Sequence, residues 1–247
     1  MKKLIIILTY NEAENIRDVI EAVNRETPGA DILIVDDNSP DGTGEMVDDL
    51  IRSDIYSGQL YVIHRPCKLG VASGYVDAYH WAFERGYEVC MEFDADFSHD
   101  LSAIEPMFEA MTDYDLLIGS RYVRGGNIKN WDWKRRFLSY WGNIYERVVL
   151  FSGIHDLSGG MNCYRTDLLK DIKLDTLISQ GYLFHAECKF RAMLLNAHIG
   201  EYPICFTDRV KGKSKLNSSI LKEVLFGIVR LSLSRWKIKK IMGLKYD

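Results

Sequence analysis

Short apolar runs alternate with helical patterns over the first hundred residues of the chain. The runs have the length and composition of buried strands, and the segments between them repeat apolar residues at the spacing of amphipathic helices. The expected strands are residues 3–8, 31–35, 60–64 and 88–93, and the expected helices are residues 14–25, 44–52 and 71–85. This alternation predicts an α/β fold, with a mostly parallel sheet flanked by helices and connected by right-handed crossovers.

The second half of the chain has a less regular pattern and ends in a basic segment. The expected elements are a strand at 116–118, helices at 134–151 and 187–196, a strand at 199–206 and a helical pattern from 218 onward. Although the 247-residue chain has a net charge of −4, the lysines and arginines between residues 209 and 245 are opposed by Glu223 alone. We therefore expect one α/β domain over residues 1–217 and an amphipathic, basic helical segment over residues 218–247.

The segment 218–247 has two interpretations. Its apolar face is typical of a helix packed on the domain, and also of a helix lying at a membrane interface. The sequence Trp236-Lys237-Ile238-Lys239-Lys240 favours the second. No run of the chain approaches the ~18–20 apolar residues that a membrane span needs, so we do not expect the chain to cross a bilayer.

Polar residues follow three of the expected strands directly. Thr9-Tyr10-Asn11-Glu12 follows the first strand, Asp36-Asp37 follows the second, and Asp94-Ala95-Asp96 follows the fourth. In open α/β sheets, ligands bind outside the carboxyl ends of the strands. These three segments are therefore expected to form a common site.

Asp94 and Asp96 are the strongest candidates for metal ligands. One residue separates them, and in a strand this spacing points both carboxylates to the same face. Two carboxylates can hold Mg²⁺ or Mn²⁺, which complete their shells with water and substrate phosphates. Asp-x-Asp also occurs in solvated turns, but a second acidic pair, Asp36-Asp37, at another strand end favours a site. A carboxylate there can accept hydrogen bonds from a nucleoside.

Basic residues and histidines supply further candidates. A diphosphate needs more positive charge than one metal ion provides, and arginine offers a two-pronged donor, so the candidate phosphate ligands are Arg121, Arg135, Arg209 and Lys215. His99 and His185 are candidates by position only.

Missing motifs exclude several classes of protein. Gly42-Thr43-Gly44 lacks the glycine pattern of a dinucleotide fold and the lysine of a Walker motif. The sequence has no Ser/His/Asp arrangement and no histidine pair at zinc-binding spacing. The five cysteines form no Cys-x-x-Cys pair, which favours a reducing, cytosolic setting. The acidic net charge argues against a nucleic-acid partner.

In their order along the chain, these motifs resemble the inverting family 2 glycosyltransferases with the GT-A fold. Within that family they are most similar to the dolichol-phosphate (polyprenol-phosphate) mannose synthases, and the likeness covers nearly the whole chain. It rests on Thr9-Tyr10-Asn11-Glu12, residues 35–43, Lys68-Leu69-Gly70, residues 94–99, Gly119-Ser120-Arg121-Tyr122 and Ser214-Lys215-Leu216. By this resemblance, residues 1–217 are expected to be the GT-A catalytic domain.

The resemblance implies a role for each site residue. The implied ligands of a nucleotide-sugar donor are Leu8, Tyr10, Glu12, Val35, Asp37, Asp94, Ala95, Asp96, Arg121, Arg209 and Lys215. The implied metal ligands, for Mg²⁺ or Mn²⁺, are Asp94, Asp96 and Ser98, and the implied catalytic residues are Asp94, Asp96 and Arg121. Arg135 and Ser139, four apart on one helical face, are expected to bind the acceptor phosphate.

The implied activity is transfer of mannose from GDP-mannose to a dolichol or polyprenol phosphate, with a β-linked product. A lipid phosphate with a second pKa near ~6 is already ionised at pH 7, so this acceptor needs no general base. The expected location is the cytoplasmic face of a membrane, reached through the terminal helices or a membrane-anchoring partner protein.

The chain departs from the family pattern near the expected donor and acceptor. Leu8 replaces a proline, His185 replaces a glutamine, residues 158–162 lack the usual Phe-Arg, and His99-Asp100-Leu101 lacks a proline. Two other activities therefore stay open: a family 2 enzyme with a UDP-sugar donor or a glycan hydroxyl acceptor, and nucleotidyl transfer. A catalytically inactive binding protein of the same fold is the alternative from another class.

Overall fold

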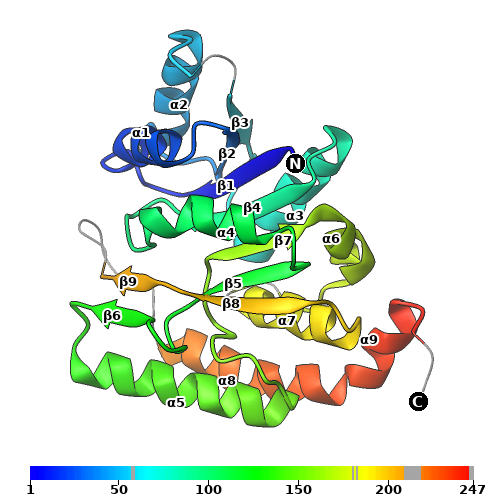
Figure 1. Cartoon of the computed structure of the whole chain (residues 1–247). Helices are drawn as coiled ribbons and strands as arrows, with labels where there is room; N and C mark the ends of the chain where they lie inside the picture. Colours follow the sequence, from blue (N-terminus) through cyan, green and yellow to red (C-terminus); the bar gives the residue numbers. More distant parts are fainter. Residues whose placement is uncertain (57–58, 180, 182, 209–217, 245–247) are drawn as a thin grey trace.

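A seven-stranded sheet runs through the centre of the computed structural model, which describes residues 1–56, 59–179, 181, 183–208 and 218–244 (Figure 1). The strand order is β3-β2-β1-β4-β7-β5-β8. The strands are β1 (Lys3–Thr9), β2 (Ala30–Asp36), β3 (Leu60–His64), β4 (Val89–Asp94), β5 (Leu116–Ser120), β7 (Asn162–Arg165) and β8 (Ile199–Pro203). The sheet is parallel except for β7, which pairs antiparallel with β4 and β5. The predicted mostly parallel α/β sheet is confirmed.

The register of the central strands aligns their carboxyl ends. Leu8 of β1 pairs with Val35 of β2 on one side and with Asp94 of β4 on the other. The register of β1 is fixed by burial on both of its faces, because Leu4 and Ile6 pack in one core while Ile5 and Ile7 pack in the other. The polar segments after the three strands are thereby brought to one edge of the sheet.

Helices cover both faces of the sheet (Figure 1). One core receives the apolar sides of α1 (Ile16–Glu26), α2 (Thr43–Arg52) and α4 (Ile104–Ala110). The other core receives α3 (Val71–Glu84), α6 (Thr166–Ile172) and α7 (Leu183–Leu194). Two short 3₁₀ helices, η1 (Leu101–Ala103) and η2 (Leu174–Thr176), connect these elements.

The last layer is formed by α5 (Trp133–Leu150), α8 (Ser218–Leu233) and α9 (Arg235–Ile241), beside the two-stranded sheet of β6 (Asn127–Lys129) and β9 (Cys205–Thr207). α8 lies along α5 at the end of the molecule far from β3 (Figure 1). Ile228 and Leu231 of α8 are buried in the core, and Ser232 Oγ donates a hydrogen bond of 2.8 Å to the carbonyl of Val149. The C-terminal helices are thus packed on the domain, while Phe226 and Leu233 stay exposed.

The structure differs from the expected elements mainly after residue 100. The expected strand at 199–206 is two strands, because the chain leaves β8 at Ile204 and pairs with β6 instead of β5. The expected helix near 187 begins at Leu183. Four elements were not predicted: α4, β6, β7 and α6. Each has three to seven residues, which is too short for a hydrophobic period to be distinct.

Gly126 offers a test of how tightly the edge of the sheet is packed. A Cβ on Gly126 would lie 2.6 Å from the carbonyl oxygen of Ser120 and 2.8 Å from the carbonyl carbon of Arg121, whereas a Cβ on Gly142 of α5 would meet nothing within 4 Å. We expect Gly126→Ala to lower the free energy of unfolding by about 1–3 kcal/mol, because backbone must shift. The matched Gly142→Ala is expected to raise it by up to ~1 kcal/mol. Urea unfolding measures both, and equal effects would contradict this packing.

Candidate active site

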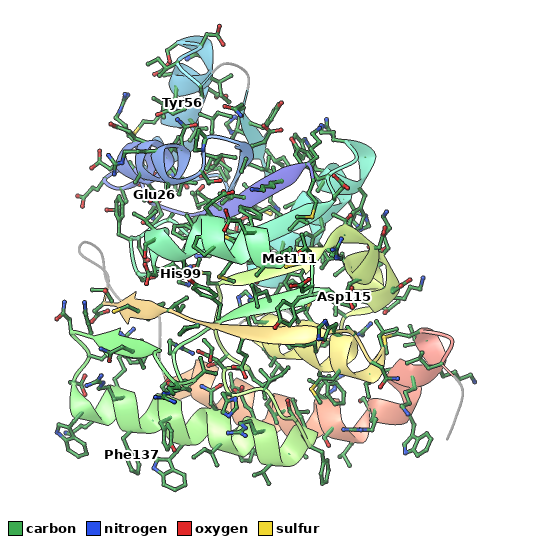
Figure 2. All side chains as sticks on the ribbon, in the orientation of Figure 1. Glu26, Tyr56, His99, Met111, Asp115 and Phe137 are labelled. Carbon is green, nitrogen blue, oxygen red and sulfur yellow. The ribbon has the colours of Figure 1, made fainter. Side chains whose placement is uncertain are left out.

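The turn after β4 holds the acidic pair in place. Asp96 is buried, and its Oδ1 accepts a hydrogen bond of 3.1 Å from the backbone N–H of Ser98. The Asp94 backbone N–H donates to His99 Nδ1 at 3.2 Å, so His99 carries its proton on Nε2, which lies 3.3 Å from Asp94 Oδ2. His99 lies near β9 (Figure 2), where its ring packs on Phe206. Asp94 is left 45% exposed, open to a ligand.

The residues of this turn fit a hard divalent ion. Ser98 Oγ is buried and has no hydrogen-bond partner within the described part of the chain, as expected for an oxygen that a ligand would complete. Two carboxylates and a hydroxyl suit Mg²⁺ or Mn²⁺, which keep several positions for water and phosphate oxygens. Among the described residues, no group of three acidic, histidine or cysteine side chains forms a closed metal cage.

The two aspartates at the carboxyl end of β2 have different surroundings. Asp36 is buried and accepts hydrogen bonds from Thr9 Oγ1 at 2.9 Å and from both the N–H and the hydroxyl of Ser39, so it ties β1 to the turn after β2. Asp37 is partly exposed and contacts the buried guanidinium of Arg65. Burial raises the pKa of Asp37 more than the charge of Arg65 lowers it.

Arg65 and Lys68 were not expected to touch the predicted donor ligands. Arg65 follows β3 directly, and its Nε lies 2.9 Å from Asp77 Oδ2 of α3, so it anchors Asp37 to that helix. Lys68 Nζ lies 3.8 Å from the centre of the Tyr10 ring. Since Arg65 occupies the position directly after an expected strand, the rule that singled out the other strand ends could have found it.

Arg121 is held by a buried partner that was not predicted. Its Nε and Nη2 donate to the two carboxylate oxygens of Asp156, both at 2.7 Å, and Nη2 also donates to Ser158 Oγ at 3.0 Å. Burial alone would lower the pKa of Arg121, but the charge of Asp156 raises it above its ordinary value. The guanidinium lies beside the rings of Trp131 and Phe206 at the centre of the site. Its expected catalytic role stays a prediction.

The expected acceptor residues lie on the first two turns of α5. Asp132 caps this helix by accepting hydrogen bonds from the N–H groups of Lys134 and Arg135. The Arg135 guanidinium lies 3.9 Å from the Trp131 ring, and its Nη1 donates to Asp208 Oδ1 at 2.8 Å.

Two donors of this cluster have no acceptor among the residues that the structure describes. Arg135 Nε and Trp131 Nε1 are both buried without a hydrogen-bond partner in the described residues. Ser139, one turn further along α5, shares a hydrogen bond of 2.7 Å with the Tyr122 hydroxyl. Unsatisfied buried donors beside a guanidinium suit an anion, since such groups are costly to leave unpaired.

Aromatic contacts connect the two halves of the site. The ring of His99, which contacts Asp94, lies 5.6 Å from that of Phe206. The Phe206 ring in turn lies 5.5 Å from the ring of Trp131, and the Arg135 guanidinium lies over that Trp131 ring at 3.9 Å. The structure therefore brings the expected metal and acceptor residues together. Arg209 and Lys215, the other expected donor ligands, lie outside the described residues.

A buried charged cluster supports the site from behind. Lys189 of α7 is fully buried, and its ammonium group donates hydrogen bonds to the carbonyls of Asp156, Leu157 and Gly159 at 2.8–3.1 Å, which fixes the glycine-rich turn. Burial lowers the pKa of Lys189 to about 8. Burial likewise raises the pKa of Glu146 to about 7, and Glu146 Oε2 has no hydrogen-bond partner in the described residues.

The fold is that of the GT-A glycosyltransferases, as expected. TarS 1–349 of S. aureus, solved in complex with UDP-GlcNAc, superposes with a TM-score of 0.62 and 19% identity, covering 100% of this chain and 68% of that one. The mannosyltransferase PcManGT of Pyrobaculum calidifontis, solved with GDP-Man and Mn²⁺, gives a TM-score of 0.59 and 15% identity, with 98% and 73% coverage.

Sequence comparison defines the family. The model of glycosyl transferase family 2 matches residues 4–173, and the chain belongs to that family. The polyprenol monophosphomannose synthase of Mycolicibacterium smegmatis is 38% identical, over 98% of this chain and 91% of that protein. The undecaprenyl-phosphate mannosyltransferase of Micrococcus luteus is also 38% identical, over 96% and 97%. The resemblance predicted from the motifs is confirmed.

The supporting cluster predicts a pH-dependent stability. Since the pKa of Glu146 is raised from 4.5 to about 7, its cost to the folded state is absent below pH 4.5, grows up to about pH 7 and is then constant. Glu146→Gln should therefore leave the free energy of unfolding unchanged near pH 4.5 and raise it by about 2–3 kcal/mol above pH 7.

Urea unfolding between pH 4.5 and 8 measures this difference. Glu109→Gln, on the exposed side of α4, is the control and should change the free energy little at any pH. A Glu146→Gln effect that does not grow between pH 4.5 and 7 would contradict a buried, penalised carboxylate.

Proposed function

We propose that this family 2 glycosyltransferase transfers mannose from GDP-mannose to a polyprenyl monophosphate. The observation that carries the proposal is the anion-binding cluster of Trp131, Arg135 and Ser139, linked through His99 and Phe206 to the acidic pair. A phosphate acceptor suits this cluster. The names of the two relatives at 38% identity support the same acceptor and sugar.

The acidic pair would serve the donor. Asp94, Asp96 and Ser98 would hold Mg²⁺ or Mn²⁺, which when bound supplies positive charge to the departing diphosphate. The nucleoside site would be lined by Val35 and Leu8, which strand pairing aligns with Asp94. Tyr10, whose ring is contacted by the Lys68 ammonium group, would line it too. Asp37 and Glu12 would accept hydrogen bonds from its N–H and hydroxyl groups.

Arg135 would position the acceptor for an in-line displacement. An oxygen of the lipid phosphate forms a bond to the anomeric carbon while the bond from that carbon to the diphosphate breaks, so GDP leaves and the configuration changes from α to β. The phosphate oxygen carries its negative charge before it attacks. Arg135, with Ser139 and the Trp131 N–H, would hold this charge and orient the attacking oxygen.

An exposed apolar face suggests how the lipid is reached. Trp133, Phe137 and Trp141 of α5 are 72%, 59% and 51% exposed, and Phe226 and Leu233 of the neighbouring helix α8 are exposed as well. Figure 2 shows Phe137 on the outer side of α5. Exposed basic residues accompany this face: Lys134, Arg136, Arg230, Lys237 and Lys240.

This face, which we call the α5/α8 face, fits an anionic bilayer surface. Aromatic rings and lysines are the side chains that interfacial helices present to lipid headgroups. Glu146 is the one acidic residue in the described side chains of α5, α8 and α9, and it is buried. Within the described residues, no helix is both long and apolar enough to cross a membrane. We propose that the protein docks on the cytoplasmic face of a membrane through the α5/α8 face.

The transfer reaction and its acceptor site can be tested together. With Mg²⁺ or Mn²⁺, the protein should convert GDP-mannose and a short polyprenyl monophosphate into GDP and the mannosyl lipid. Arg135→Gln should raise the KM for the lipid phosphate by roughly 10–100-fold, which corresponds to a lost charged hydrogen bond, and leave the KM for GDP-mannose nearly unchanged. Lys134→Gln, next to it but exposed, is the matched control.

Two outcomes would contradict the proposal. Incorporation of sugar only into a glycan, with the lipid monophosphate inert, would exclude the proposed acceptor. A change in the KM for GDP-mannose alone would place Arg135 at the donor instead.

Docking of the α5/α8 face can be tested by vesicle co-sedimentation. The triple variant Trp133→Ser, Phe137→Ser, Trp141→Ser should bind vesicles of mixed neutral and anionic lipid at least ~10-fold more weakly than the wild type, because each ring removed deprives the interface of buried apolar area. The control Ile55→Ser removes an equally exposed apolar side chain from the α2 end of the molecule. Equal binding by the triple variant and the control would exclude this face.

A further inference from the structure

His185 is a buried imidazole at the carboxyl edge of the sheet that the proposed reaction does not use. It lies in the first turn of α7 and is 8% exposed. The rings of Tyr75 and Phe184 pack on it at centroid distances of 5.6 and 5.4 Å. Its Nδ1 lies 3.1 Å from Glu92 Oε2. The ring therefore has one defined position and one defined partner.

Glu92 determines which nitrogen of His185 carries the proton. This residue lies in β4, two positions before Asp94, and is fully buried. Its carboxylate also accepts hydrogen bonds from the Tyr79 hydroxyl at 2.7 Å and from the side-chain N–H of Asn162 at 2.5 Å. Because all three neighbours donate to Glu92, the proton of His185 is on Nδ1, and Nε2 presents a lone pair.

His185 Nε2 lies near the turn that carries the acidic pair. No hydrogen bond in the described part of the chain uses His185 Nε2. A Cβ placed on Gly160 would lie 3.7 Å from His185 Nε2 and 3.7 Å from His99 Cε1, so the glycine leaves a gap between the two imidazoles. His99 in turn contacts Asp94. The charge of Asp94 also reaches the ring that packs on His185, because it contributes, after burial and Glu92, to the raised pKa of Tyr75.

We propose that His185 Nε2 accepts a hydrogen bond from one hydroxyl of the transferred sugar and thereby determines sugar specificity. This inference rests on the proposed function. The sugar is attached directly to the diphosphate, so it occupies the space next to Asp94 and within reach of this gap. An imidazole that directs its Nδ1–H to Glu92 and offers Nε2 as an acceptor matches a hydroxyl donor, whereas a dianionic acceptor phosphate has no proton to share with it. A buried acceptor left unpaired by a deoxy sugar is penalised, which provides the discrimination.

Deoxy donors test the contact one hydroxyl at a time. We would measure kcat/KM for GDP-mannose and its 2-, 3-, 4- and 6-deoxy analogues with the wild type and with His185→Leu, which keeps apolar contact with Tyr75 and Phe184. For one analogue the wild-type kcat/KM should fall roughly 10–100-fold, and this ratio should shrink to within ~3-fold in His185→Leu. The other three ratios should not change. His185→Gln, which offers an amide oxygen, should restore part of the lost discrimination.

A matched control and a binding measurement separate specificity from damage to the fold. His80 also pairs with a carboxylate, Asp175 at 2.8 Å, but is exposed on α3, so His80→Leu should leave all four ratios unchanged. GDP alone should bind His185→Leu as it binds the wild type, while GDP-mannose binds more weakly.

Three outcomes would overturn the inference. Four ratios in His185→Leu equal to those of the wild type would exclude a sugar contact. An equal loss of kcat for every donor, together with loss of GDP-mannose hydrolysis, would identify His185 as a general base instead. If the wild type does not transfer sugar from GDP-mannose, the proposed donor is wrong and the inference fails with it. That result differs from failure of the His185 contact alone, in which wild-type transfer is observed.

Discussion

Leu8 pairs with Val35 on one side and with Asp94 on the other, and this register brings the segments after β1, β2 and β4 to one edge of the sheet. A slip of β4 by one residue would turn Asp94 into the core and bring an apolar side chain to the edge. The slip is opposed by the full length of β1, whose inner residues are buried on both faces. The apolar strands thus do more than stabilise the domain. They set the spacing between the proposed nucleoside ligands and the acidic pair.

Several charged side chains behind this edge of the sheet are fully buried. Glu92, Asp156, Lys189 and the ion pair of Glu187 with Arg191 are all fully buried. Such groups are retained only when hydrogen bonds satisfy them, because the cost of removing an unpaired ion from water is large. Each of them fixes a neighbour: Asp156 orients Arg121, and Lys189 gathers three carbonyls of the glycine-rich turn. The candidate site residues are therefore held in place by polar contacts among the protein's own buried groups.

The sequence was sufficient for the parallel strands of the sheet and for the polar segments that follow them, because these depend on local periodicity and on the rule that ligands bind at carboxyl ends. Asp94, Asp96 and Asp37 were singled out as candidates in this way. Asp156 and Glu92 were not, since their partners lie between 13 and 93 positions away in the sequence, and no local pattern distinguishes a buried carboxylate from a solvated one. β7 was not predicted for a related reason. It is only four residues long, and it pairs antiparallel between β4 and β5, which an all-parallel sheet would place side by side.

α5 turns two different surfaces in opposite directions. Arg135 and Ser139 face the site, while Trp133, Phe137 and Trp141 face outward. An α-helix with its side chains is only about 10–12 Å across, so if the outer side rests on lipid, the phosphate is met one helix width above the membrane. The first isoprene units of the chain would then leave the bilayer together with the phosphate, while the rest of the tail stays among the lipids. An enzyme built in this way would contact the headgroup and the start of the chain but not the rest of the tail. A single protein could then accept polyprenols of different lengths.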